Sequence, residues 1–463
     1  MSTHQSRAQQ NRRVVRKRFV CAMIAWIFLP IAGGAQTIPI SEYAERRARI
    51  LRALPDGILL LHARSTPKAM EQWGWVQDAS FFYFSGFANL PSAILALDGP
   101  RGEARLFVPP APLSFGVPVH EVIPATGAES AQKHRLTAIE PWQQFRPYIE
   151  KRIAEGTKRI YLDGARRPEA TGVPDGMWPV AGEKTLWRYS VQQAFPEAEI
   201  VSAVEKIRQL RWVKSATEIA ILRANAEKTA QALLAGIRRI APGVSQRQAE
   251  AAVVAACLEN GGEGPSFWPW LMSGANTEMR RLVRSFYDYS HLNRTMQAGE
   301  LVRVDIGCAG GFYGGDVGRT VPVSGQFSNE QRDIWNLLVA AYHAGLQAVR
   351  PGVSRKEIYA ASTAEIVRRN ATMQTAVGKK AAAQMLDAES GVRWHLHGIG
   401  VESGEEALEI LQEGTVFAFE PGFAFGGDAY YLEDMVVVTK TGREILSTGL
   451  PYTANEIEAA MAK

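Results

Sequence analysis

The chain has 463 residues, 46% of them hydrophobic and 21% charged, and this composition excludes a wholly disordered protein. The length exceeds that of one ordinary hydrophobic core and predicts two or three domains. The formal charge is +5, but residues 1–35 carry six basic residues and no acidic one, so the remainder is close to neutral. A near-neutral body argues against a nucleic-acid or membrane-surface partner, because binding to phosphates needs clustered cations.

Residues 1–35 have the three-part pattern of a secretory signal peptide. A basic stretch at 12–18 precedes an apolar run at 19–31, and small residues follow at 32–35. The apolar run is shorter than the roughly 20 residues that span a bilayer. We therefore predict export to the periplasm or the medium. The alternative is an uncleaved segment that would attach the chain to a membrane.

Residues 41–203 predict a small α/β domain with a mixed sheet. Short strand patterns alternate there with turns rich in glycine and proline. These patterns lie at residues 57–61, 93–97, 105–108, 160–162 and 200–201.

The cysteines exclude both a disulfide scaffold and a cysteine-rich zinc module, because the chain contains only three. Cys21 lies in the predicted signal peptide. Cys257 and Cys308 lie in apolar surroundings, which predicts inert buried side chains rather than reactive thiols.

Residues 204–455 contain an internal repeat. The sequence Pro-Gly-Val-Ser occurs at 242–245 and at 351–354, each time between two predicted helices and upstream of strand-like segments. Ser245 and Ser354 each precede a Gln or Glu by three residues, which is the pattern of a capping box at a helix start. Two copies are too few for a solenoid, so we predict a duplicated domain with a pseudo-twofold axis and a site between its halves.

Four acidic residues interrupt apolar strand patterns in this duplicated domain. Asp305 belongs to a strand at 301–307, and a glycine-rich hairpin should return Asp316 to its side. Glu420 ends a second apolar strand and Glu433 lies in a valine-rich one. Any one of them could be a surface or salt-bridged carboxylate. Four buried together would repel one another, which makes bound cations the better interpretation.

His397 precedes the last two of these acids and completes a candidate ligand set. Four carboxylates and one imidazole suit Mn²⁺, Co²⁺ or Zn²⁺ and are poor ligands for copper. With two acids in each half, the pattern predicts a dinuclear centre. Such a centre has ions about 3.5–4 Å apart and holds a bridging hydroxide that attacks a polarised carbonyl.

The order Asp305, Asp316, His397, Glu420, Glu433 resembles the pita-bread metallopeptidases, which include methionine aminopeptidase, prolidase and aminopeptidase P. In that family the matching residues bind two metal ions. Residues 75–87 (WVQDASFFYFSGF) also resemble the signature of the aminopeptidase P amino-terminal domain, which methionine aminopeptidases lack.

This resemblance implies a pita-bread catalytic domain over residues 204–455 behind the smaller domain. It also implies an Xaa-Pro aminopeptidase, which removes the first residue of a peptide whose second residue is proline. Two divalent ions, manganese first, would be the cofactors, and Glu420 would be the base toward the metal-bound water. The resemblance further implies that identical subunits assemble into an oligomer.

Three positions depart from the family pattern. Gly404 stands where a histidine that contacts substrate is usual, and Tyr431 stands where an arginine is common. A further family histidine has no counterpart in residues 277–284. His291 could be a displaced proton donor or an ordinary loop histidine, and by spacing Asp288 could fall at that position instead.

Two further residues are expected to support the ligands. Arg319 should orient Asp316, with a plain salt bridge as the alternative, and His395 should share the face of His397. Loss of one proton-handling residue typically slows catalysis about 10²–10⁴-fold, so a slower hydrolase is expected rather than an inert one.

Three alternative functions stay open at this point. The chain could be a metal- or peptide-binding protein that has lost turnover, as Gly404 suggests. It could be a prolidase-type Xaa-Pro dipeptidase. A metal-free hydrolase of the creatinase kind is disfavoured, because that kind lacks the metal-binding carboxylates that this chain retains.

Overall fold

The computed structural model describes residues 37–65, 76–114, 116–164 and 183–462. These residues belong to a single compact unit. The predicted signal peptide and Trp75 of the amino-terminal signature lie outside the described residues. Among the helices of the described part, none combines the length and the apolar character needed to cross a membrane.

The amino-terminal part is built on a six-stranded mixed sheet with strand order β6-β3-β2-β1-β7-β8. The central strand β1 pairs antiparallel with β2 and parallel with β7, as the sequence predicts. The bounds are β1 Gly57–His62, β2 Ile94–Asp98, β3 Glu103–Val108, β6 Ala138–Pro141, β7 Arg159–Leu162 and β8 Glu199–Ser202, with a short hairpin of β4 Leu113–Ser114 and β5 Val117–Pro118. The helices are α1 Ile40–Ala53, α2 Ala79–Ser85, α3 Ala128–Lys133, α4 Phe145–Ala154, α5 Glu183–Ala194 and α6 Val204–Trp212.

Both faces of this sheet are buried, which explains its continuous apolar strands. Leu59 and Leu61 of β1 belong to one hydrophobic cluster, whereas Ile58 and Leu60 belong to another. Successive strand residues point to opposite faces, so each cluster covers one side of the sheet.

The carboxyl-terminal part consists of two halves, and each half begins with two helices and continues into strands. The first half has α7 Ala216–Arg239, α8 Gln246–Glu259, β9 Gly264–Pro265, β10 Trp270–Ser273, α9 Met279–Leu292, β11 Leu301–Ile306, β12 Cys308–Ala309 and β13 Val317–Pro322. The second has α10 Asn329–Ala348, α11 Arg355–Arg369, α12 Ala376–Met385, β14 Leu396–Gly398, β15 Val416–Phe419, β16 Gly422–Phe425, β17 Asp428–Tyr431, β18 Asp434–Val438, β19 Arg443–Ile445 and α13 Ala454–Met461.

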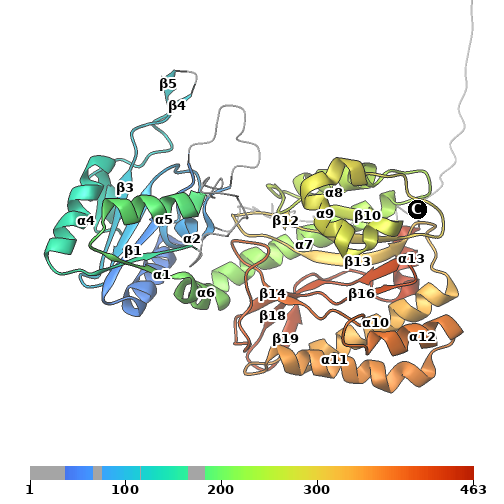
Figure 1. Cartoon of the computed structure of the whole chain (residues 1–463). Coiled ribbons are helices and arrows are strands. Elements are labelled where there is room, and N and C mark those ends of the chain that lie inside the picture. The colour runs from blue at the N-terminus through green and yellow to red at the C-terminus, as the bar shows by residue number, and fades with distance from the viewer. Residues whose placement is uncertain (1–36, 66–75, 115, 165–182, 463) are drawn as a thin grey trace, which may run out of the picture. The chain divides into compact units, whose positions relative to one another are not determined.

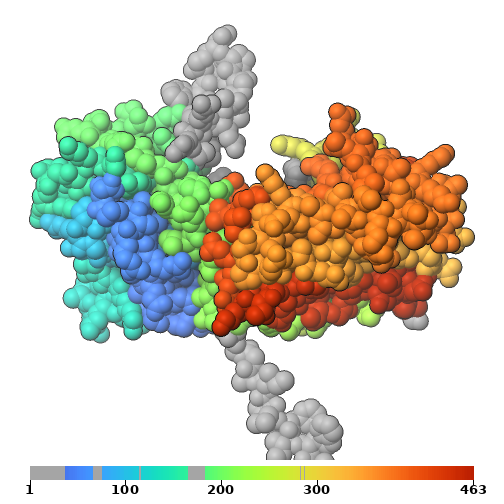
Figure 2. Space-filling model, turned by 90° about the horizontal axis from the view of Figure 1, so that it is seen from below, coloured from blue at the N-terminus to red at the C-terminus, as the bar shows by residue number. Residues whose placement is uncertain are grey.

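Helices enclose the strands of both halves. In Figure 1 the strands lie between α7 and α8 of the first half and α10 and α11 of the second. Figure 2 shows the molecule from below, where the helices of the second half, in orange, cover much of the carboxyl-terminal part. The main sheets are β10-β11-β13 in the first half and β14-β15-β18-β19 in the second.

The two copies of Pro-Gly-Val-Ser have the same local structure as well as the same sequence. Gly243 and Gly352 adopt nearly the same left-handed backbone, with φ of 86° and 87°. Ser245 and Ser354 each form a complete capping box, at the starts of α8 and α11. The predicted duplication is therefore confirmed at the level of individual backbone conformations.

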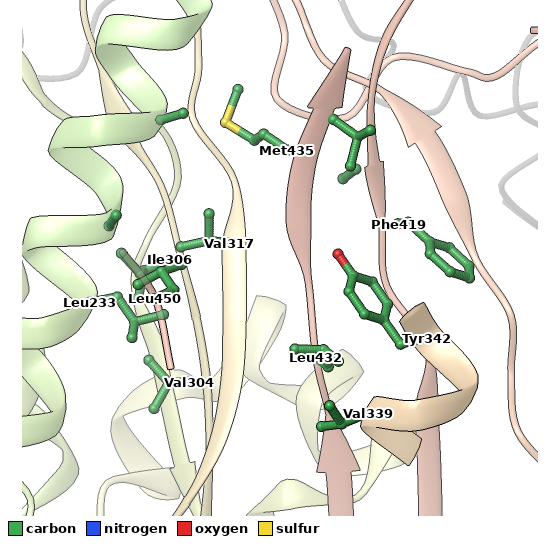
Figure 3. Close-up of a cluster of buried hydrophobic side chains, with 14 of the residues drawn as sticks. Leu233, Val304, Ile306, Val317, Val339, Tyr342, Phe419, Leu432, Met435 and Leu450 are labelled. Carbon is green, nitrogen blue, oxygen red and sulfur yellow. The ribbon is translucent and has the colours of Figure 1, made fainter. Parts of the chain in front are cut away.

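One buried hydrophobic cluster joins the two halves. Figure 3 shows Leu233, Val304 and Val317 of the first half on one side, and Tyr342 and Phe419 of the second half on the other. Packing of this kind fixes the strands of both halves relative to each other.

Cys257 and Cys308 form a disulfide, which corrects the expectation of inert buried thiols. Both residues are buried as predicted, but the bond joins α8 to β12. Their Cα atoms are 5.4 Å apart, within the range that a disulfide can bridge. The pairing depends on how α8 packs beside β12, which a separation of 51 residues does not reveal.

Candidate metal centre

The first half contributes Asp305 and Asp316 through a strand hairpin. Asp305 lies in β11 directly opposite Gly318 of β13, and Asp316 is the residue that precedes β13. Both aspartates are buried. The predicted hairpin therefore brings the two carboxylates to one end of the β11–β13 pair.

The second half contributes His397, Glu420 and Glu433. His397 lies in β14, and Glu420 follows the end of β15. The sequence placed Glu433 inside one valine-rich strand, but the structure breaks that strand, and Glu433 lies between β17 and β18. At this break the backbone of Glu433 pairs with Gly318, which connects the two halves at the site.

Three of the four acidic side chains, those of Asp316, Glu420 and Glu433, converge on the imidazole of His397. Its Nε2 atom lies 3.5 Å from Oε1 of both Glu420 and Glu433, and 3.7 Å from Oδ2 of Asp316. Two overlapping groups have ligand atoms close enough to hold a metal ion. They are Asp316, His397 and Glu433, and His395, His397 and Glu420.

Burial and mutual repulsion shift the protonation of this cluster. Burial raises the pKa of Asp305 to about 7, although the nearby Arg303 opposes the shift. Burial, together with the charges of Glu433 and Asp305, raises the pKa of Asp316 well above its usual value. Burial alone would lower the pKa of His397, but Glu433 and Glu420 outweigh it and raise that pKa to about 9. A positive charge placed among these carboxylates would therefore stabilise the cluster.

Unpaired oxygens show that the residues fit divalent cations. Asp316 Oδ1 and Glu433 Oε1 are buried without a hydrogen-bond partner in the described part of the chain. The hydroxyl of Tyr431 lies 2.7 Å from Glu420 Oε2 and 2.6 Å from Glu433 Oε2, yet it has one proton to donate. Oxygen-rich groups with spare lone pairs are the ligands that hard divalent ions prefer.

The five residues line a cavity of about 960 Å³. Aromatic side chains, among them Phe267, Trp270 and Trp394, form part of its wall. Apolar walls around a few convergent polar groups are typical of a small-molecule or peptide site.

His395 lies where the sequence predicts, beside His397. It lines the cavity and its Nδ1 contacts Glu420 Oε1. Burial alone would raise the pKa of Glu420, but the hydrogen bond from His395 and the charge of His397 lower it to about 2.

Two other expectations are wrong. Arg319 forms the salt bridge that was the alternative and does not orient Asp316. Its guanidinium pairs with Asp434 and bonds to the carbonyl of Glu433, because β13 directs it toward β18. His291 lies on α9 with 77% of its side chain exposed and contacts Asp288, so the structure does not bring it to the cavity. α9, the helix that carries His291, is exposed along most of its length.

The sequence reasoning overlooked the role of Arg303. This buried arginine lies 3.0 Å from Asp305 Oδ2. Its position two residues before Asp305 on the same strand was the available signal, because alternate strand residues share a face.

The comparisons with known proteins agree with this geometry. Residues 220–440 match the model of metallopeptidase family M24. This part of the chain therefore resembles a family of metal-dependent peptidases, and it has the pita-bread fold that the sequence resemblance implies.

The chain has the two-domain organisation of aminopeptidase P, because residues 43–161 match the aminopeptidase P N-terminal domain. It is 27% identical over 471 residues to the Xaa-Pro aminopeptidase of Escherichia coli, covering 91% of this chain and 97% of that protein. It is 25% identical over 379 residues to the Xaa-Pro dipeptidase of Pyrococcus furiosus, covering 79% and 90%. The solved proline aminopeptidase P II from Yersinia pestis has the same fold, with a TM-score of 0.71 at 23% identity, covering 92% and 99%.

Proposed function

We propose that the protein is a dinuclear metallopeptidase that removes the first residue from peptides with proline in second position. The observation that carries the proposal is the buried acidic cluster around His397, with its unpaired oxygens in a peptide-sized cavity. The relative from Escherichia coli, an Xaa-Pro aminopeptidase, matches over nearly its whole length. The proposed ligands are Asp305, Asp316, His397, Glu420 and Glu433, with manganese first and cobalt or zinc as alternatives.

Two divalent ions at these ligands would supply an activated water and polarise the scissile carbonyl. The chain's own groups handle the proton. Glu420 would accept it, since its Oε1 atom is 3.5 Å from His397 Nε2 and also in contact with His395. The exposed ring of His395 connects Glu420 with the open part of the cavity. The aromatic wall would exclude water from the peptide.

Peptides longer than two residues are the proposed substrates. The cavity of about 960 Å³ is at the upper end of the roughly 300–1,000 Å³ usual for ligand pockets, which leaves room beyond a dipeptide. The Xaa-Pro dipeptidase function stays the second candidate, because the Pyrococcus furiosus relative has it. The ratio of kcat/KM for an Xaa-Pro dipeptide and a longer Xaa-Pro peptide distinguishes the two.

The main test is hydrolysis of Xaa-Pro peptides by residues 36–463 after metal removal and after addition of Mn²⁺, Co²⁺ or Zn²⁺. We expect metal-dependent release of the first residue, and no release by Asp316→Ala. If the protein binds metal but releases nothing, it is the binding protein without turnover. If it binds no metal, the ligand assignment is wrong.

The missing histidine provides a sharper test of the catalytic rate. Gly404 lines the cavity, and a Cβ atom added there meets no atom within 4 Å. Gly404→His should therefore be tolerated and should raise kcat/KM, by up to about 10²–10⁴-fold if it restores proton transfer. Gly404→Asn is the control, because it adds a polar side chain that does not titrate. Equal rates for Gly404→His and Gly404→Asn would mean that another group already handles the proton.

We also propose that the protein is exported. The signal-like residues 1–35 support this, and so does the Cys257–Cys308 disulfide, because disulfides persist in oxidising compartments. Cell fractionation followed by alkylation of free thiols tests the proposal. Periplasmic or secreted protein should react at neither Cys257 nor Cys308 until it is reduced. Assembly into oligomers stays a prediction, which light scattering on the purified chain can test.

A further inference from the structure

Arg303 and Tyr431 form a buried pair beside the acidic cluster. The guanidinium carbon of Arg303 lies 3.7 Å from the centroid of the Tyr431 ring. Arg303 also bonds to Asp305 Oδ2 at 3.0 Å, and the Tyr431 hydroxyl contacts Glu420 and Glu433 at 2.7 and 2.6 Å. One stacked pair therefore contacts three of the five proposed ligands.

We propose that the Arg303–Tyr431 pair positions the carboxylates of Asp305, Glu420 and Glu433 for metal binding. This inference rests on the ligand assignment made under the proposed function. Groups that hold ligands in place typically change metal affinity about 10–100-fold, because they restrict the ligands to the binding geometry before the ion arrives.

The backbone gives the Tyr431 ring a single position. A Cβ atom at residue 318 would lie 2.1 Å from Tyr431 Cε1, so the ring fits only because residue 318 is glycine. The amide of Tyr431 donates to Thr320 Oγ1 at 2.7 Å, and its carbonyl accepts from the same hydroxyl at 3.2 Å. The phenol oxygen is thereby fixed between Glu420 and Glu433.

The charge of Arg303 makes the pair more than a packing contact. In the described part of the chain, the five proposed ligands form ion pairs with histidines and with one arginine, Arg303. It is buried, as Tyr431 is, so neither side chain can leave for solvent. The pair reduces repulsion within the cluster, yet Asp316 Oδ1 and Glu433 Oε1 keep their unpaired positions for a metal ion.

The test measures metal binding by the metal-stripped chain, with Mn²⁺ or Zn²⁺ in competition with a chromophoric chelator. Tyr431→Phe removes only the hydroxyl. Arg303→Met removes the guanidinium, with its charge and its hydrogen bond to Asp305, and keeps an unbranched side chain. We expect each to weaken metal binding about 10–100-fold. Arg303→Lys should recover part of the loss. The double variant should lose less than the product of the two single losses, because the two residues act as a unit.

Tyr430→Phe is the matched control, because Tyr430 is the neighbour on the same strand and is equally buried. It should leave the metal affinity unchanged. Melting of each variant in excess chelator separates positioning from stability. Tyr431→Phe that melts like the parent but binds metal more weakly supports the pair. A loss of affinity only in proportion to a loss of stability would overturn it.

A failure of the pair differs from a failure of the metal site. If Tyr431→Phe and Arg303→Met bind metal like the parent while Asp316→Ala does not, the positioning role is wrong and the site stands. If Asp316→Ala also binds like the parent, the ligand assignment is wrong and the positioning role is wrong with it.

Discussion

Glu433 and Asp434 are neighbours in sequence, yet they belong to two different buried clusters. Asp434 accepts hydrogen bonds from Arg319, Tyr342 and Ser447, so both of its oxygens are paired. Glu433 belongs to the acidic cluster, where its Oε1 atom has no hydrogen-bond partner in the described part of the chain. A buried carboxylate whose oxygens all have hydrogen-bond partners stabilises a fold, whereas a buried carboxylate with an unpaired oxygen indicates a binding site.

The strongest test of this comparison removes one charge from each cluster. Arg319→Met leaves Asp434 buried without its cation and should lower the free energy of unfolding by about 3–5 kcal/mol. Asp316→Asn removes a carboxylate that its neighbours repel, so the metal-free protein should be equally stable or more stable. Urea unfolding in excess chelator measures both. Equal destabilisation by the two variants would contradict the comparison.

Stability should change with pH in opposite directions for a buried acid whose pKa is lowered by neighbouring cations and for one whose pKa is raised by burial. Burial alone would raise the pKa of Glu405, but Arg211 and Lys214 lower it to about 2. Its contribution to stability is therefore full above the unfolded value of 4.5 and is lost as the pH falls toward 2.

Asp305 should behave in the opposite way. Its pKa is about 7 in the folded, metal-free chain against 3.8 in the unfolded one, so the folded state holds a proton that the unfolded state lacks. Metal-free stability should therefore fall as the pH rises from about 4 to 7, by at most about 1.4 kcal/mol per pH unit. Unfolding free energies measured across this range should decline less steeply for Asp305→Asn than for the parent, because Asp316 still contributes. An unchanged decline would show that Asp305 is not its source.

The smallest effect concerns Glu250, a buried acid outside both clusters. Its Oε1 atom has no partner among the described residues, and burial raises its pKa to about 7. The unfolded chain releases this proton near pH 4.5 and the folded chain only near pH 7, so stability falls across this range. The gain from Glu250→Gln should therefore be about 1 kcal/mol larger at pH 8.5 than at pH 6. Thermal melts at pH 6 and 8.5 measure this. The exposed Glu259→Gln on the same helix is the control, and an equal gain in both variants would refute the explanation.

The starts of α8 and α11 and the residue pattern of β11 were predictable because their signals are local. The capping serines, the Pro-Gly turns and the alternation in β11 each depend on residues a few positions apart. The break at Glu433 was not predictable, because most of residues 430–438 are aromatic or β-branched and favour a strand. Only the pairing of Glu433 with Gly318 of the other half interrupts it.

The sequence by itself determined the duplicated domain and the five candidate ligands, because buried acids in apolar strands have few explanations other than a metal. The tertiary structure alone decided the partners of these residues. It directed Arg319 to Asp434, joined Cys257 to Cys308, and placed Arg303 against Tyr431. Such choices depend on strand register and on the packing of distant segments, and a shift of one residue would direct the same side chains to the opposite face.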